Sequence, residues 1–321
     1  MTEAKNTAIL LATYNPPKKW FAALLDSLDA QTYPNLHLYV RDDASPEIAE
    51  TELLEMLSAH LHKLPYSFFR NERNLGSNGT FARLVKDCAG EEYVSFCDQD
   101  DVWDADKVER SVRLLENSPL HPVAVCTDLR VIDGDGKLLA DSMTKHRKRH
   151  IYLRGEGLAP ALIYRNFLTG CATLTRREWA LSCLPFPDGL VHDHYLAFRA
   201  ACDGAIDFDP VPSMSYRVYG GNQTGVMTGV RTKRDYYDRR IAVFEERITV
   251  LERYADFPEL REARAWCDAR KDNYFRRKGG FRRLWKQKQV NRTTSLFELF
   301  ALRFPSPLFR FSIRLIQKRI L

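Results

Sequence analysis

Residues 93–101, YVSFCDQDD, join an uncharged, largely apolar run to three carboxylates. The run predicts a buried strand over 93–97, and Asp98, Asp100 and Asp101 follow its carboxyl end. Carboxylates this close repel one another unless a cation or hydrogen-bond donors compensate them. Hard divalent cations such as Mg²⁺ or Mn²⁺ prefer oxygen ligands and bridge carboxylates to phosphates. The alternative is that Asp101 or Asp104 caps a helix over 105–115, and the motif alone does not decide between the two.

Three upstream segments end in the same way. Strands are predicted over 7–13 (TAILLAT), 36–41 (LHLYVR) and 66–70, with helices over 18–31 and 45–62 between them. Polar groups follow these strands at Tyr14-Asn15, at Asp42-Asp43 and at Asn74-Leu75-Gly76. The alternation predicts an α/β sheet with helices on its faces. Because ligands bind at the carboxyl ends of strands in such sheets, we expect the four polar segments to meet at one site.

The rest of the chain is less regular. A polar loop is expected over 71–79, before a helix over 80–88. Further predictions are a strand over 123–132, a basic and mobile surface loop over 143–154, a strand over 167–175, helices over 176–181 and 193–202, an extended segment over 210–219 and a long helix over 233–272.

Several motifs together carry a family resemblance. They are ATYNPP (12–17), Asp42-Asp43, NLGSNGTF (74–81), FCDQDDVWDADKV (96–108), FLTGCATLTRREW (167–179), VHDHYL (191–196) and YRVYGGNQTG (216–225). In this order they resemble family 2 glycosyltransferases of the GT-A fold, over roughly residues 7–225. The motif DQDDVW (98–103) and His192, directly before Asp193, most resemble bacterial rhamnosyltransferase-like enzymes of surface polysaccharide assembly. The resemblance implies a Rossmann-like mixed sheet flanked by helices in a catalytic domain over 1–230, with a helical, basic region over 231–321.

The resemblance also implies a metal-dependent, inverting transfer from a nucleotide-diphosphate sugar, linked to dTDP or UDP, to a hydroxyl of a glycan or lipid-linked saccharide. Asp100 would hold Mg²⁺ or Mn²⁺. The residues implied to bind the donor are Thr13, Tyr14, Asn15, Asp42, Asp43, Asn74, Gly76, Ser77, Asn78 and Asp98. Taken alone, Tyr14-Asn15 also fits a simple turn before Pro16-Pro17. The segment 74–78 also fits an ordinary loop with a helix cap.

Asp193 is the implied general base, since a carboxylate within hydrogen-bond reach can take the proton of an attacking hydroxyl. It would also cap a helix beginning at His194. His192 and His194 raise a zinc alternative, although a third spaced ligand is missing. Tyr219 stands where relatives often carry a metal-binding histidine, and residues 220–229 are either a lid or a linker.

Two rival functions remain at this stage. A sugar nucleotidyltransferase would show a glycine-rich, basic phosphate loop early in the chain, and residues 13–20 contain none. A non-catalytic membrane or nucleic-acid adaptor on the same fold would bind no nucleotide in a metal-dependent way.

Composition is that of an ordinary globular protein, with 45% hydrophobic and 28% charged residues. No apolar run approaches the roughly 20 residues that span a bilayer, and the N-terminus lacks signal-peptide features. We therefore expect a cytoplasmic protein. The seven scattered cysteines include no C-x-x-C pair, which argues against disulfides or structural zinc.

Charge is distributed unevenly. Residues 270–321 carry 15 Lys and Arg against two Asp and Glu, whereas the whole chain has a net charge of +6. Aromatic and aliphatic residues alternate with these basic residues, which predicts amphipathic helices on the anionic cytoplasmic face of a membrane. The alternatives are packing against the same chain or a second subunit in a homo-oligomer. Nucleic-acid binding is not the expected role.

Overall fold

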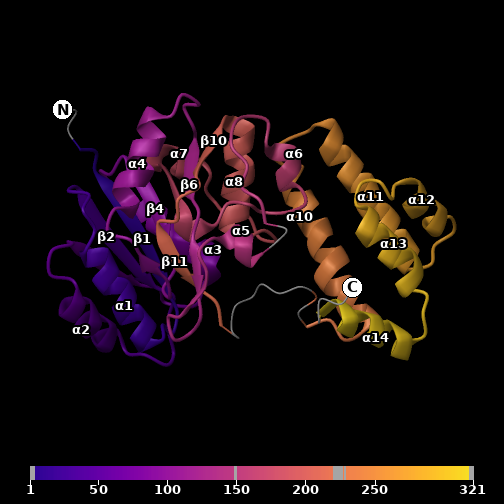
Figure 1. The fold of residues 1–321 in the computed structure, drawn as a ribbon, viewed down its shortest axis with the longest axis horizontal. Coiled ribbons are helices and arrows are strands. Elements are labelled where there is room, and N and C mark those ends of the chain that lie inside the picture. The colour runs from indigo at the N-terminus through magenta and orange to yellow at the C-terminus, as the bar shows by residue number, and fades with distance from the viewer. Residues whose placement is uncertain (1–3, 148–149, 220–226, 228, 318–321) are drawn as a thin grey trace. The chain divides into compact units, whose positions relative to one another are not determined.

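The computed structural model describes residues 4–147, 150–219, 227 and 229–317. The chain forms two compact units, Met1–Tyr219 and Gly220–Leu321. The first runs from indigo to salmon in Figure 1, and the second is orange to yellow.

The first unit is built on a seven-stranded mixed sheet in the order β10-β6-β9-β4-β1-β2-β3. β9 is antiparallel to both of its neighbours, and the other pairs are parallel. The strands are β1 (Thr7–Thr13), β2 (Leu36–Asp42), β3 (Tyr66–Arg70), β4 (Tyr93–Cys97), β6 (Ala124–Thr127), β9 (Thr173–Arg176) and β10 (Ile206–Asp209). This confirms the expected mixed α/β fold.

A second, four-stranded sheet has the order β5-β11-β7-β8. Its strands are β5 (Val102–Trp103), β7 (Arg130–Ile132), β8 (Leu138–Ala140) and β11 (Met214–Arg217). The single strand predicted over 123–132 is therefore wrong, because the segment divides between the two sheets. Asp128 Oδ1 accepts a hydrogen bond from Leu129 N at 2.8 Å, a local bond that competes with continued strand pairing.

Helices cover both faces of the main sheet. Ile9 and Leu11 of β1 share one apolar cluster with α1, α2 and α4. Ala8 and Leu10 point to the opposite face, and α3 packs on β1 and β2 beside α7 and α8. The helices are α1 (Lys18–Asp29), α2 (Glu50–His60), α3 (Gly76–Asp87), α4 (Lys107–Asn117), α5 (Met143–His146), α6 (Ala159–Leu162), α7 (Arg177–Ser182) and α8 (His192–Asp203).

Three local predictions are corrected. The expected loop over 71–79 is too long, because α3 already begins at Gly76. The basic segment over 143–154 includes the short helix α5, held by the buried Met143. The segment predicted as a strand over 167–175 contains a 3₁₀ turn, Gly170–Ala172, before β9 begins.

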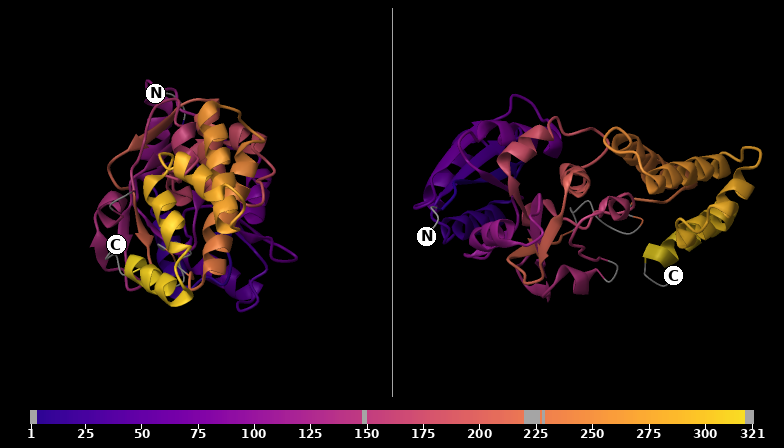
Figure 2. Two further views of the ribbon diagram at one scale, coloured as in Figure 1. Left: turned by 90° about the vertical axis from the view of Figure 1, so that its right-hand side faces the viewer. Right: turned by 90° about the horizontal axis from the view of Figure 1, so that it is seen from above.

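The second unit is helical (Figure 2). It contains α9 (Lys233–Tyr236), a π-helical turn (Tyr237–Ala242), α10 (Val243–Leu251), α11 (Pro258–Tyr274), α12 (Gly280–Lys286), α13 (Arg292–Ala301) and α14 (Ser306–Gln317). The helix predicted over 233–272 is interrupted between Leu251 and Pro258, where proline opens the next helix at its first position. Throughout the described ranges, every helix falls short of the length and apolar character that a membrane span requires.

A buried ion pair joins two of these helices. Arg270 on α11 donates to Glu298 on α13 at 2.6 Å, and Tyr236 Oη donates to the same carboxylate at 2.9 Å. Trp266 Nε1 donates to Ser295 Oγ nearby. A charge pair this deep is stable only when hydrogen bonds satisfy both partners, as they do here.

Candidate active site

The strand register brings the predicted polar segments to one edge. Thr13 at the end of β1 lies opposite Asp42 on β2, and Leu11 lies opposite Cys97 at the end of β4. The segments that follow these strands therefore leave the sheet side by side.

A cavity of about 270 Å³ opens at this edge. Six of the predicted site residues line it, namely Thr13, Tyr14, Asp43, Ser77, Asp98 and Asp100. Five more lining residues were not predicted: Ala12, Thr80, Phe81, Gln99 and Tyr216. The other predicted residues do not line it, namely Asn15, Asp42, Asn74, Gly76, Asn78 and Asp193.

Gln99 couples two walls of the cavity. Its side chain accepts a hydrogen bond from Tyr14 N at 2.7 Å and donates one to Tyr14 O at 3.0 Å. Gln99, which lies between Asp98 and Asp100, thus fixes the backbone after β1. The acidic pattern gives no signal for this role, because it places no requirement on the residue between the two aspartates.

Asp42 and Asn15 support the cavity from behind. Asp42 is fully buried, and its carboxylate accepts hydrogen bonds from the Thr13 hydroxyl and from the backbone and hydroxyl of Ser45. Asn15 has a φ of 44°, and its side chain accepts from Glu47 N. Both residues hold loops in place.

Asp43 holds the start of α3. Its carboxylate accepts hydrogen bonds from Leu75 N at 2.7 Å and from Gly76 N at 2.8 Å. Asn74 also accepts from Gly76 N. Asn74 and Gly76 thus form the entry to the helix, where unpaired N–H groups need acceptors.

The first turn of α3 is also tied to α8. Asn78 Oδ1 accepts a hydrogen bond from His192 N at 2.8 Å, and its amide donates to Pro187 O and Leu190 O. Ser77 Oγ lies 3.2 Å from His192 Nδ1. Asn78 therefore stands in for a capping residue at the N-terminus of α8.

The acidic motif is electrostatically strained. Burial raises the pKa of Asp98 to about 7, and the charges of Asp100 and Asp193 add to the effect. Burial also raises the pKa of Asp100, although a hydrogen bond from Tyr219 opposes the rise. Gly170 and Cys171 lie between the two carboxylates, because Gly170 packs against the Asp193 side chain and Cys171 Sγ lies within 4.8 Å of an Asp98 oxygen.

Asp101 faces inward rather than capping a helix. It is fully buried, and Oδ1 accepts from Arg217 N at 3.0 Å while Oδ2 has no hydrogen-bond partner in the described part of the chain. Burial raises its pKa well above the usual value. The capping alternative for Asp101 and Asp104 is wrong, because α4 begins only at Lys107.

One group of side chains here has the composition of a metal site. Among the described residues, there is one group of three or more acidic, histidine or cysteine side chains whose ligand atoms all lie within 4.8 Å of one another. It consists of Asp98, Asp101 and Cys171. Asp100, the predicted metal ligand, is not one of these three residues but lies between two of them in sequence. The oxygen donors suit a hard divalent cation, and the partnerless Asp101 oxygen is consistent with one.

Two cations near this motif were not predicted. Arg217 on β11 donates to Asp100 O at 2.8 Å and so fixes the backbone of the motif. Lys107 is fully buried, with Nζ 3.4 Å from the centre of the Trp103 ring, and burial lowers its pKa to about 8. Both residues lie inside motifs of the family resemblance, Lys107 in 96–108 and Arg217 in 216–225, but their residue types alone did not indicate these roles.

Asp193 lies in the first turn of α8, which begins at His192. The expectation that it caps a helix starting at His194 is therefore wrong. Burial raises its pKa to about 6, opposed by hydrogen bonds from the backbone of His194 and Gly170 and from Asn166. Its Oδ1 is buried without a hydrogen-bond partner among the described residues. Among the described residues, this oxygen therefore has no donor that compensates its burial.

The zinc alternative receives no support from the two histidines. His194 Nε2 bonds Leu162 O at 2.6 Å, whereas His192 packs between Phe81 and Phe186. Burial lowers the pKa of His192 to about 3, so its ring is neutral.

Tyr219 reaches the acidic motif. Its hydroxyl hydrogen-bonds Asp100, and its ring lies 4.6 Å from the ring of Trp20. Most of the segment 220–229, predicted to be a lid or a linker, lies outside the described residues.

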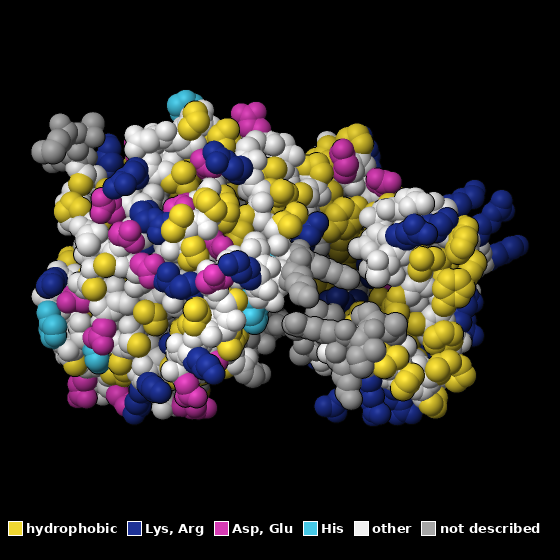
Figure 3. Space-filling view, in the orientation of Figure 1, with side chains coloured by type: hydrophobic (Ala, Val, Ile, Leu, Met, Phe, Trp, Pro, Cys, Tyr) yellow, Lys and Arg dark blue, Asp and Glu magenta, His cyan; other side chains and the backbone are white. Residues whose placement is uncertain are grey.

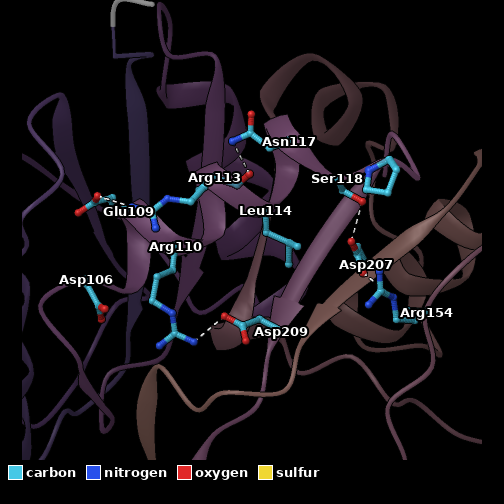
Figure 4. Close-up of a pocket in the computed structure, with 11 residues that line it drawn as sticks. Asp106, Glu109, Arg110, Arg113, Leu114, Asn117, Ser118, Arg154, Asp207 and Asp209 are labelled. Carbon is cyan, nitrogen blue, oxygen red and sulfur yellow. Dashed lines mark hydrogen bonds and ion pairs between the residues drawn. The ribbon is translucent and has the colours of Figure 1, made fainter. Parts of the chain in front are cut away.

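A larger cavity, of about 630 Å³, lies beside α4 and β10 (Figure 4). Six of its seven charged residues form ion pairs, Arg110 with Asp209, Arg154 with Asp207 and Arg113 with Glu109, and Asp106 is the seventh. It contains none of the predicted site residues. The chemistry therefore belongs to the smaller cavity.

Solved structures share the fold. S. aureus TarS in complex with UDP-GlcNAc aligns with a TM-score of 0.58 over 98% of this chain and 92% of that chain, at 18% identity. The mannosyltransferase PcManGT of Pyrobaculum calidifontis, in complex with GDP-Man and Mn²⁺, aligns with a TM-score of 0.58 over 99% and 87%, at 17% identity. At these identities the likeness shows the GT-A fold alone.

Curated relatives are distant. The dTDP-rhamnosyl transferase RfbG of Shigella flexneri is 25% identical over 242 residues, 70% of this chain and 76% of the relative. The UDP-Glc:alpha-D-GlcNAc-diphosphoundecaprenol beta-1,3-glucosyltransferase WfgD of Escherichia coli is 24% identical over 192 residues, 59% and 67%. An uncharacterized glycosyltransferase of Nostoc is 26% identical over 44% of this chain, and the match spans only 42% of that relative.

The family model described as "Glycosyl transferase family 2" matches residues 8–181. The match spans more than half of the chain and includes β1 to β4 and the acidic motif. This protein therefore belongs to glycosyltransferase family 2.

Proposed function

We propose that this glycosyltransferase is inverting, with Asp193 as the general base. The observation that carries the proposal is the state of this one side chain. It packs against Gly170, its Oδ1 is buried with no hydrogen-bond partner among the described residues, and its charge raises the pKa of Asp98 in the cavity wall.

In the proposed reaction, an acceptor hydroxyl attacks the anomeric carbon of the sugar while the nucleotide diphosphate leaves from the opposite side. The hydroxyl proton passes to Asp193, and a new glycosidic bond replaces the bond to the diphosphate. A base must be ionised to accept a proton. Asp193 meets this requirement above about pH 6.

Asp100 is the proposed ligand for Mg²⁺ or Mn²⁺, supported by its carboxylate neighbours Asp98 and Asp101. A bound cation would neutralise charge that develops on the departing diphosphate. Tyr219 orients the Asp100 carboxylate through its hydrogen bond. Tyr14, Asp43 and Ser77, which line the cavity, are the proposed contacts to the nucleotide and ribose.

We further propose a dTDP- or UDP-linked donor, with dTDP-rhamnose as the first candidate to test. The proposed acceptor is a lipid-linked saccharide in cell-surface polysaccharide synthesis. Two relatives support these classes, the dTDP-rhamnosyl transferase RfbG and the glucosyltransferase WfgD, which uses UDP-Glc and a diphosphoundecaprenol-linked acceptor. Such an acceptor would place the enzyme on the cytoplasmic face of the membrane.

The replacement Asp193→Asn tests the mechanism. It keeps the shape of the side chain and removes the base, so we expect transfer to fall by about 100-fold or more, while calorimetry shows donor affinity within a few-fold of the original. The matched control is Asp188→Asn, an exposed carboxylate on the preceding loop. Transfer retained in the Asp193 variant would remove this residue from the mechanism.

The rival functions predict other outcomes. A nucleotidyltransferase would form a nucleotide sugar from a nucleoside triphosphate and a sugar phosphate. A non-catalytic adaptor would show no Mn²⁺-dependent binding of UDP or dTDP in calorimetry. A panel of nucleotide sugars, assayed for hydrolysis, would then identify the donor.

A further inference from the structure

We propose that helices α12 to α14 present a docking surface for anionic lipid, with aromatic and leucine side chains that insert and basic side chains that contact head groups. The proposal goes beyond the transfer reaction and does not depend on it. Figure 3 shows yellow apolar side chains gathered over this part of the second unit, with dark blue basic side chains at their edges.

Helix α14 has two apolar stripes. Phe309 and Ile313, four residues apart, are buried in the core of the second unit. Leu308 and Phe311, three residues apart, form another stripe, and they are 45% and 57% exposed. A helix that only packed against its own unit would need the first stripe alone.

The basic residues of α14 border the exposed stripe. With 3.6 residues per turn, Arg310 and Arg314 fall on one side of the helix, between the buried and the exposed stripes. Both are exposed, and no carboxylate in the described ranges pairs with either. This order around the helix is the one that suits the boundary between acyl chains and head groups.

Helix α12 repeats the arrangement. Phe281 and Trp285 are one turn apart and exposed, with parallel rings whose centres lie 6.4 Å apart. Arg282 and Lys286 follow them in sequence and are exposed. Tryptophan beside basic residues is typical of a helix at the membrane interface.

Charge decides which partner fits. The two acidic residues of 270–321 are already engaged, Asp272 with Arg277 and Arg283, and Glu298 with Arg270. The surface is therefore positive without internal compensation. A second copy of the chain would bring the same positive charge, and nucleic acid would leave the apolar stripes exposed to water. An anionic bilayer satisfies both features.

The test uses the full chain and two kinds of vesicle, phosphatidylcholine alone and phosphatidylcholine mixed with phosphatidylglycerol. We expect sedimentation with the anionic vesicles and at least about tenfold weaker partition into the neutral ones. The double replacement Leu308→Glu with Phe311→Glu should reduce anionic binding about tenfold or more.

The matched control is Leu138→Glu with Leu139→Glu on β8, since Leu138 is 53% exposed and the added charge is the same. Equal loss in the control pair would overturn the proposal. So would equal binding to both kinds of vesicle, a salt-resistant dimer in light scattering without vesicle binding, or preference for an RNA oligonucleotide over vesicles.

A second measurement does not depend on a charged replacement. Brominated acyl chains should quench the fluorescence of the bound protein, and Trp285→Phe should remove most of that quenching. Quenching that is unchanged in this variant would contradict insertion of α12. Helical content by circular dichroism checks that the helical second unit of each variant remains folded.

Discussion

The Asp98 carboxylate in the candidate donor site lowers the stability of the folded protein. Its carboxylate is partly buried in the cavity wall and lies near the charges of Asp100 and Asp193, and burial and these charges together raise its pKa to about 7. The ionised form is therefore less stable in the folded chain than in the unfolded one. Sites built to bind a cation commonly retain such strain until the ligand arrives.

Replacing Asp98 by Asn should raise the melting temperature, and more so at pH 8 than at pH 5. The folded pKa, about 7, lies above the ordinary value of 3.8. Below pH ~4 the Asp98 carboxyl is protonated in both states and does not destabilise the fold. Its destabilising effect grows as the pH rises and is complete above about 7. We expect a gain of a few degrees at pH 8 by calorimetry in EDTA. The same gain at both pH values would contradict the raised pKa, and transfer activity should fall in either case.

At this scale the sequence predicted part of the cavity. Carboxylates directly after an apolar strand are visible as a pattern, so Asp43, Asp98 and Asp100 were found. Tyr216 and Gln99 were not, because a tyrosine on a strand and a glutamine between two aspartates fit many surroundings. Their roles depend on which segments lie opposite, and only the fold supplies that.

At the scale of elements, the first turn of α3 connects Asp43 after β2 to the N-terminus of α8. Asp43 holds its entry, and Asn78 connects it to the N-terminus of α8, where Asp193 lies. The motif NLGSNG predicted donor binding for Asn78, but both ends of its amide are engaged with protein atoms. A hydrogen bond across 114 residues of sequence cannot be inferred from local pattern.

Asn78→Ala separates the two roles. If Asn78 positions Asp193, kcat should fall by about 10- to 100-fold while the dissociation constant of the donor stays nearly constant. Asn78→Asp keeps the acceptor for His192 N and should recover part of kcat. Weaker donor binding with kcat retained would instead assign Asn78 to the donor, as the sequence predicted.

At the scale of the whole molecule, the chain divides its work between two units with separate cores. The change from an acidic to a basic composition near residue 270 predicted a second surface, and the sequence pattern of this region predicted helices. What the sequence could not give is the pairing of Arg270 with Glu298, because a lone Glu among so many basic residues has many candidate partners.

Glu298→Ala should therefore act on the second unit. It leaves Arg270 buried without its counter-charge and removes the acceptor of Tyr236, which costs about 3–5 kcal/mol. In calorimetry we expect one unfolding transition to move to lower temperature, while the transition that UDP or dTDP stabilises stays in place. The control is Glu246→Ala, an exposed glutamate on α10. A single transition that moves as one in the variant would mean that the two units unfold together and that the Arg270–Glu298 pair stabilises the nucleotide-binding unit as well.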